Sequence, residues 1–193
     1  ESDVPIAWVC LLDGVRTLSG VRHALFECLA HGVFYREVTQ PANEMTAVYF
    51  ERYYVDDAAL RLYSAAEHLA NALIFMLQIR DQDLEPYREG RTSQQAIVGR
   101  FLAEKRPDLP VSRVVRDLAA STEWQAAMAY RNEWVHGQPP TVEGLGIVYH
   151  RRRRWRTGTD GSLYLGIGGG DTPRYTTGEL MGTVRGALDG ILR

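Results

Sequence analysis

The sequence predicts an all-α fold: an up-and-down helical bundle with a β-hairpin inserted before the C-terminal helix. Apolar side chains recur with the helical period in several long segments. Residues typical of helix ends separate those segments, and one late stretch alternates between apolar and polar side chains. The 193 residues suit a single domain. We expect a helical bundle over 1–140, a hairpin and loop over 141–175 and a helix over 176–193.

The longest helices are predicted in the first part of the chain. A short helical or extended lead-in precedes a helix from Val15 to about Leu29. Pro41 is suited to open the next helix, because proline is tolerated in a first turn. We expect that helix to bend around Val55–Asp57. The segment Ala58–Ile79 then predicts one long core helix, since its apolar residues alternate between spacings of four and three.

Shorter helices are predicted between residues 93 and 137. Ser93 is a suitable N-cap for the first of them, which ends before two prolines. A short helix is expected near Val111–Ala119. Another begins at Ser121 and ends at Gly137, a residue type that favours helix C-termini. This last helix carries the candidate functional residues.

The hairpin is predicted from alternation of side-chain type. Ile147–Trp155 and Leu163–Ile167 both alternate, and Thr157–Gly161 supplies turn residues between them. Thr176 and Glu179 have the spacing of a capping box, in which each residue binds the other's backbone amide. A C-terminal helix should therefore begin at this point.

Composition excludes several classes of protein. Hydrophobic residues make up 45% of the chain and charged residues 24%, with a net charge of −2, which is unlike an intrinsically disordered protein. No uninterrupted apolar run approaches the roughly 20 residues of a membrane span, so we expect no membrane contact. Cys10 and Cys28 are too few for a zinc knuckle or a disulfide framework. We expect a cytoplasmic protein without a secretion signal, metal or cofactor.

Three polar residues stand near the end of the helix predicted before Gly137. Asn132 follows Arg131 directly, and four residues separate Arg131 from His136. On an ideal helix Asn132 and His136 share a face, whereas Arg131 lies about 140° from His136 and must reach round. Both cations could simply stabilise the helix C-terminus, an effect of about 0.3–1 kcal/mol. Convergence on one phosphate is the functional alternative.

This run resembles the R-x4-6-H motif of the HEPN superfamily. Ribonucleases of that superfamily usually carry a small polar residue after the arginine, as Asn132 does here. The resemblance is specific over Ala126–Pro140, and it implies two motifs facing each other across a homodimer. It also implies RNA cleavage without metal, in which His136 transfers a proton, Arg131 stabilises the phosphate and Asn132 orients phosphate or imidazole. The implied roles are stress response, antiphage defence or pairing with an antitoxin protein.

Two further groups are candidates for substrate binding. Glu67 and His68, on the long helix, could form a second wall of the site, although buried polar residues more often satisfy one another. The first hairpin strand carries a basic run with aromatic neighbours, which suits the backbone and bases of RNA. An edge strand protected by charge is the alternative for this run. Its residues are His150, Arg151, Arg152, Arg153 and Arg154.

The leading hypothesis from the sequence is therefore a dimeric, metal-independent endoribonuclease of the HEPN type. One alternative is a non-catalytic HEPN-like dimer that binds nucleotide or nucleic acid without cleaving it. Another is a protein-interaction domain in which the motif only stabilises a helix end.

Overall fold

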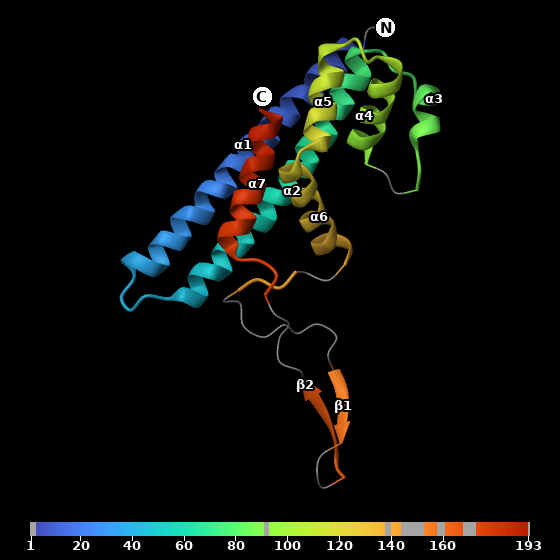
Figure 1. Ribbon diagram of the computed structural model, residues 1–193. Helices are drawn as coiled ribbons and strands as arrows, with labels where there is room; N and C mark the ends of the chain where they lie inside the picture. The colour runs from blue at the N-terminus through green and yellow to red at the C-terminus, as the bar shows by residue number, and fades with distance from the viewer. Residues whose placement is uncertain are drawn as a thin grey trace.

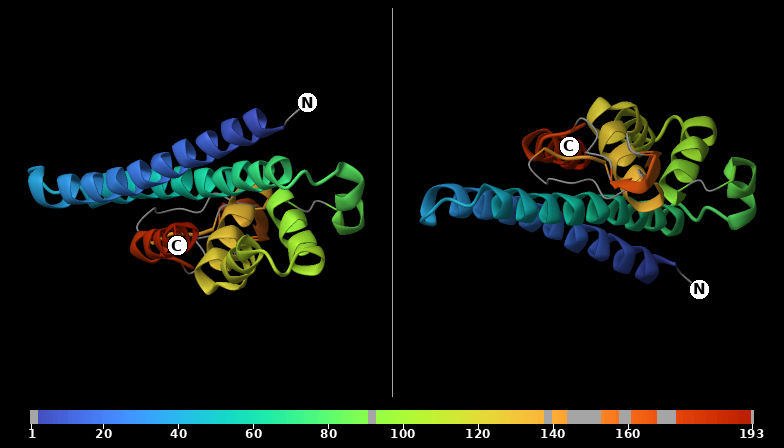
Figure 2. Two further views of the ribbon diagram at one scale, coloured as in Figure 1. Left: turned by 90° about the horizontal axis from the view of Figure 1, so that it is seen from above. Right: turned by 90° about the horizontal axis from the view of Figure 1, so that it is seen from below.

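The computed structural model describes residues 3–90, 93–137, 140–143, 153–157, 161–167 and 173–192. It is mostly helical, which confirms the all-α prediction, and its helices form a bundle (Figure 1). Figure 2 shows α2 in the middle, with α1 along one side and the later helices on the other. The second long helix therefore contacts both layers of the bundle.

The first two helices are longer than the sequence predicted. α1 spans Val4–Val33 and continues into a single π-helical segment, η1, at Phe34–Val38. The lead-in predicted before Val15 is thus part of α1. α2 spans Glu44–Met76, and the Asn43 side chain caps it by accepting a hydrogen bond from the amide of Thr46. It therefore begins at Glu44 and not at Pro41.

α2 runs without interruption through Val55–Asp57, where we expected the helix to bend. Asp56 and Asp57 lie in this segment, and each pairs with an arginine one turn away on the same helix. Arg52 Nε lies 2.8 Å from an Asp56 oxygen, and Arg61 Nε lies 2.7 Å from an Asp57 oxygen. Such i,i+4 pairs support a helix.

Four short elements follow α2. They are α3 (Asp81–Leu84), η2 (Glu85–Tyr87), α4 (Gln94–Lys105) and α5 (Pro110–Ala120). The Ser93 cap of α4 is confirmed, since its hydroxyl accepts the amide of Ala96. Pro110 begins α5 as its first residue, which is the helical position that proline tolerates best.

The last two helices begin where their caps predicted. α6 spans Thr122–His136, and the Ser121 hydroxyl accepts the amide of Trp124. α7 spans Thr177–Ile191 and begins with the predicted capping box between Thr176 and Glu179. Both helices pack against α2.

Two short strands lie between α6 and α7 in the chain. β1 (Arg153–Thr157) pairs antiparallel with β2 (Leu163–Ile167), so that Arg153 is opposite Ile167. Of the predicted RNA-binding residues, His150, Arg151 and Arg152 lie outside the described residues. Arg153 and Arg154 are described only as backbone positions of β1.

The main core lies between α1, α2, α6 and α7, and it includes Val21, Val55, Leu62, Trp124 and Val184. A second apolar cluster joins the end of α2 to α3, η2 and α4. Alanines line much of the buried face of α2, and small side chains allow neighbouring helices to approach closely.

A buried carboxylate joins three elements beside this core. Glu51 of α2 accepts 2.8 Å hydrogen bonds from Arg36 Nη2 of η1 and 2.7 Å from the Thr177 hydroxyl of α7. Gly32 makes room for it, because a Cβ there would lie 2.2 Å from a Glu51 oxygen. The Cys28 thiol donates to the Glu51 carbonyl oxygen, 3.5 Å away.

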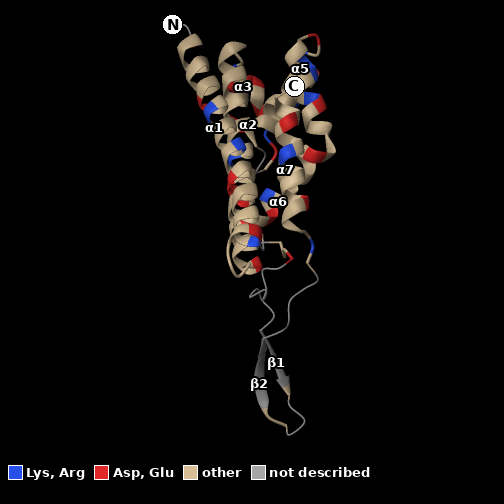
Figure 3. Ribbon diagram, turned by 90° about the vertical axis from the view of Figure 1, so that its left-hand side faces the viewer, with Lys and Arg blue, Asp and Glu red and all other residues tan. Residues whose placement is uncertain are grey.

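The N-terminal part of α1 is apolar and largely exposed. Its first nine residues, Val4–Leu12, include no charged side chain, as Figure 3 also shows. The stretch Val4–Val38 has the length and mean hydropathy (1.3) of a membrane-spanning helix, and only 22% of its most apolar window is buried. Core helices of soluble proteins, which are mostly buried, and signal sequences have the same length and composition, so α1 alone assigns no membrane span.

We predict that Cys28 resists alkylation at neutral pH while Cys10 reacts. Burial, together with the nearby Glu51 carboxylate, raises the pKa of the Cys28 thiol to about 12. Only the thiolate is nucleophilic, so Cys28 should react at least about 100-fold more slowly than partly exposed Cys10. Peptide mapping after timed iodoacetamide treatment measures both rates. Equal rates in the folded protein would contradict the packing around Cys28, whereas equal rates in denaturant are expected.

Candidate functional site

α6 divides into a buried face and an exposed stripe. Trp124, Ala127 and Tyr130 are no more than 3% exposed and pack against the core. The opposite stripe is open to solvent and contains Gln125, Ala129, Asn132 and His136. Burial of one face therefore fixes which residues α6 presents outward.

A buried polar network anchors the end of α6 to α2. The Tyr130 hydroxyl donates to Asp56 Oδ1, and Arg52 Nε donates to both Asp56 oxygens. Arg52 Nη1 also donates to the carbonyl oxygen of Pro140, 3.0 Å away. The network thus holds α6 and the chain that follows it.

Burial dominates the electrostatics of this network. It raises the pKa of Asp56 above the ordinary value, although Arg52 and the Tyr130 hydroxyl act in the opposite direction. Burial and the Asp56 charge likewise raise the pKa of Tyr130. The phenol therefore stays protonated and remains a donor to Asp56.

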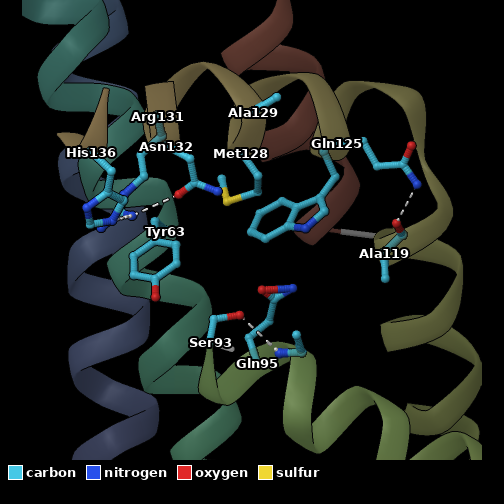
Figure 4. Close-up of a pocket in the computed structure, with 12 residues that line it drawn as sticks. Tyr63, Ser93, Gln95, Ala119, Gln125, Met128, Ala129, Arg131, Asn132 and His136 are labelled. Carbon is cyan, nitrogen blue, oxygen red and sulfur yellow. Dashed lines mark hydrogen bonds between the residues drawn. The ribbon is translucent and has the colours of Figure 1, made fainter. Parts of the chain in front are cut away.

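The structure brings the three motif residues together at the end of α6 (Figure 4). Arg131 Nη1 donates a 2.9 Å hydrogen bond to Asn132 Oδ1, and it lies 3.4 Å from His136 Nε2. The long arginine side chain thus reaches His136, although the two residues point in different directions from the helix. If His136 Nε2 accepts this contact, the neutral ring carries its proton on Nδ1.

Arg131 is held in place by an aromatic ring that the sequence reasoning missed. Its guanidinium carbon lies 3.9 Å from the ring centroid of Tyr63 on α2, a cation–π contact. Arg131 Nε is buried without a hydrogen-bond partner, and no carboxylate pairs with this arginine within the described ranges. Its charge is therefore available to an anion. Tyr63 lies four residues before Glu67 on α2, but nothing in the sequence around it indicates that Tyr63 contacts Arg131.

A cavity of about 700 Å³ opens beside the motif, between α6, α2 and the beginning of α4. Figure 4 shows Gln95 and Ser93 on one side of it, with Asn132 and Met128 opposite. Its lining residues are Tyr63, Ser93, Gln95, Ala96, Ala119, Trp124, Gln125, Met128, Ala129, Arg131, Asn132 and His136. The motif thus forms one end of a pocket large enough for a small ligand.

Glu67 and His68 do not line this cavity. The two Glu67 oxygens accept the backbone amides of Gln94 and Gln95, each at 3.1 Å, so Glu67 caps α4. His68 faces α1, where its Cβ is close to Gly14. The second wall of the pocket is formed instead by Tyr63 and the first turn of α4.

Gly137 ends α6 directly after His136. Its amide donates to the Glu133 carbonyl oxygen at 2.9 Å, and a Cβ at this position would lie 2.9 Å from the same oxygen. Arg174, just before α7, forms an ion pair with the Glu133 side chain. Both contacts fix the last turn of α6, where the motif lies.

Comparison with known proteins finds no matching family model, no matching curated protein and no matching solved structure. Within the described part of the chain, no group of three or more histidine, cysteine or acidic residues is arranged to hold a metal ion. The function has to be inferred from the residues at the end of α6 and from the cavity beside them.

We predict a pH-dependent effect of Asp56→Asn on stability. Because the pKa of Asp56 is raised above 3.8, the folded protein binds this proton more tightly than the unfolded chain. Its contribution to stability is therefore full below pH 3.8 and is lost as the pH rises through the raised pKa. Relative to the variant, the free energy of unfolding of the wild type should fall by up to about 1.4 kcal/mol for each pH unit in that window.

Urea unfolding followed by circular dichroism, at a series of pH values from 3 to 7, measures this difference. Asp117→Asn, on the exposed side of α5, controls for the loss of one negative charge. A difference between wild type and Asp56→Asn that does not change with pH would contradict the buried network.

Proposed function

We propose that the protein is a metal-independent endoribonuclease of the HEPN type that acts as a homodimer. The observation that supports this most is the convergence of Arg131, Asn132 and His136 at one end of an open cavity. The Tyr63 ring packs against the Arg131 guanidinium, and no described carboxylate neutralises the charge of this arginine. A fixed cation beside an imidazole is suited to a phosphodiester.

The proposed reaction is an internal transesterification of RNA. The ribose 2′-oxygen attacks phosphorus and loses its proton, while the bond from phosphorus to the 5′-oxygen breaks and that oxygen gains a proton. The products are a 2′,3′-cyclic phosphate and a 5′-hydroxyl. His136 Nε2 serves one proton transfer, and Arg131 stabilises the negative charge that develops on the phosphate oxygens. Asn132 keeps the guanidinium oriented through its 2.9 Å hydrogen bond.

A second copy of the chain would complete this site. Both an acid and a base are needed, and one motif supplies a single histidine. The exposed stripe of α6 has the small Ala129 one turn before Asn132, which allows another helix to approach closely. In such a dimer one His136 accepts the proton from the 2′-hydroxyl and the other gives a proton to the leaving oxygen.

The arginine-rich hairpin is the proposed contact for the RNA backbone outside the cut site. The run His150–Arg154 is strongly basic in a chain whose net charge is −2. Cytoplasmic action in stress response, antiphage defence or toxin–antitoxin pairing follows from the resemblance to HEPN proteins. An antitoxin protein would be the partner in the last case.

A non-catalytic module that binds nucleotide or nucleic acid is the second candidate function. The observation that favours it is the size of the cavity, about 700 Å³, beside an arginine without a described acidic partner. Binding would use Arg131 and Asn132 but would not require His136.

We predict that wild-type protein cuts end-labelled RNA in EDTA, and that Arg131→Ala and His136→Ala each lower the rate at least about 100-fold. The reason is that each variant removes a group needed in the transition state. Gel electrophoresis of the products at matched protein concentration, with folding checked by circular dichroism, measures the rates.

Two control variants test whether losing any exposed arginine or histidine, rather than the residues of this site, lowers the rate. Arg61→Ala removes an exposed arginine that pairs with Asp57, and His23→Ala removes an exposed histidine of α1. Both should cut RNA at the wild-type rate. If all five proteins cut equally, the activity belongs to another site or to a contaminant, and the proposal is wrong.

We also predict that reversing the charges of Arg151 to Arg154 weakens RNA binding by about 10-fold or more at low salt and reduces its salt dependence. Fewer phosphate contacts release fewer counterions. Fluorescence anisotropy with the His136→Ala protein as background measures affinity without cleavage. An unchanged affinity and salt slope would favour an edge strand that charge merely protects from aggregation.

A further inference from the structure

The cavity beside the motif has a charged end and a neutral end. Arg131 and His136 stand at one end, and among the described residues that line the cavity they are the only basic ones, with no acidic residue beside them. The remaining wall is formed by amides, small side chains, the thioether of Met128 and the ring of Trp124. This distribution suits a ligand that is anionic at one end only.

The beginning of α4 offers no free site for a second anion. A helix N-terminus normally attracts anions through its free amides. Here the amides of Gln94 and Gln95 both donate to the Glu67 carboxylate at 3.1 Å, and the amide of Ala96 donates to Ser93. Glu67 also places negative charge behind this wall. The part of a ligand that reaches α4 should therefore be uncharged.

Side-chain amides give the neutral end its hydrogen-bonding character. Figure 4 shows the Gln95 amide pointing from α4 into the cavity toward α6. Across from it, Gln125 Nε2 donates to the Ala119 carbonyl oxygen at 3.1 Å, which fixes that side chain. A primary amide offers both donors and an acceptor, the combination that pairs with the edge of a nucleobase.

Aromatic and aliphatic surface completes this end. Trp124 is only 3% exposed, so it forms a rigid wall rather than a mobile flap. Met128 adds a polarisable surface of the kind that packs on rings. The cavity volume, about 700 Å³, falls in the range of pockets that hold whole small ligands and exceeds the needs of a phosphate alone.

We propose that this cavity binds the base of a nucleotide whose phosphate lies at Arg131 and His136, with Gln95 as the residue that reads the base. The placement of the phosphate rests on the proposed function. Gln95 distinguishes bases through its amide, and Trp124 and Met128 supply the apolar wall. The site thus selects one nucleotide class, from RNA or free in solution, over a bare sugar phosphate.

Equilibrium binding tests this without any cleavage. The wild type, Gln95→Ala and Gln94→Ala are titrated by calorimetry in EDTA with the four nucleoside 5′-monophosphates and with ribose 5-phosphate. We expect at least one monophosphate to bind the wild type about 10-fold more tightly than ribose 5-phosphate. This advantage should fall at least about fivefold in Gln95→Ala and stay unchanged in Gln94→Ala.

Gln94→Ala is a matched control, because Gln94 precedes Gln95 on the same helix turn and does not line the cavity. Both backbone amides keep their bonds to Glu67 in either variant, so α4 should keep its cap. Equal binding of ribose 5-phosphate and every monophosphate, or an unchanged preference in Gln95→Ala, would overturn the proposal.

A second assay distinguishes an RNA base from a free nucleotide as the ligand of the cavity. It measures cleavage rates for four RNAs that differ at one nucleotide beside the cut. A preference that appears in both assays and weakens in Gln95→Ala supports an RNA base in the cavity. A preference in monophosphate binding alone supports a free nucleotide, and the ribonuclease proposal then fails if no RNA is cut. RNA cleavage that depends on Arg131 and His136 but shows no base preference overturns the base site and leaves the ribonuclease proposal standing.

Discussion

The attachment of α6 to α2 is the constraint on which the candidate site depends. Asp56 and Tyr63 are seven residues apart on α2, which places them about two turns apart on one face. They engage consecutive residues of α6: Asp56 accepts the Tyr130 hydroxyl, and Tyr63 lies under the Arg131 guanidinium. The first contact is buried and structural, whereas the second leaves a cation facing the cavity. One packing arrangement therefore both fixes the helix and aims its functional arginine.

Most of the arginines that hold the described fold have an acidic partner, and Arg131 differs from them. Arg36, Arg52 and Arg61 each lie within an ion pair that joins or supports helices. Arg131 contacts an amide, an imidazole and an aromatic face instead. None of these neutralises its charge, so the site keeps a net attraction for anions. This is the physical basis for proposing a phosphate ligand.

Local sequence signals predicted where α4, α6 and α7 begin, since the caps at Ser93, Ser121 and Thr176 depend only on residues three positions apart. Arg131 and His136 were singled out by their spacing together with Asn132 directly after the arginine. Their surroundings could not be predicted in this way, because Tyr63 and the first turn of α4 reach the cavity through tertiary packing. Glu67 illustrates the limit: its role as a cap for α4, 27 residues later, follows from no local pattern.

The cleavage chemistry can be tested most directly with two RNA oligonucleotides incubated with wild-type protein in EDTA. One is all ribose, and the other carries a single deoxyribose at the linkage that is cut. The account predicts that the first is cut to a 2′,3′-cyclic phosphate and a 5′-hydroxyl, and that the second is intact at that linkage. Cleavage of both at the same linkage, or products with a 5′-phosphate, would contradict a nucleophilic 2′-hydroxyl and with it the proposed function.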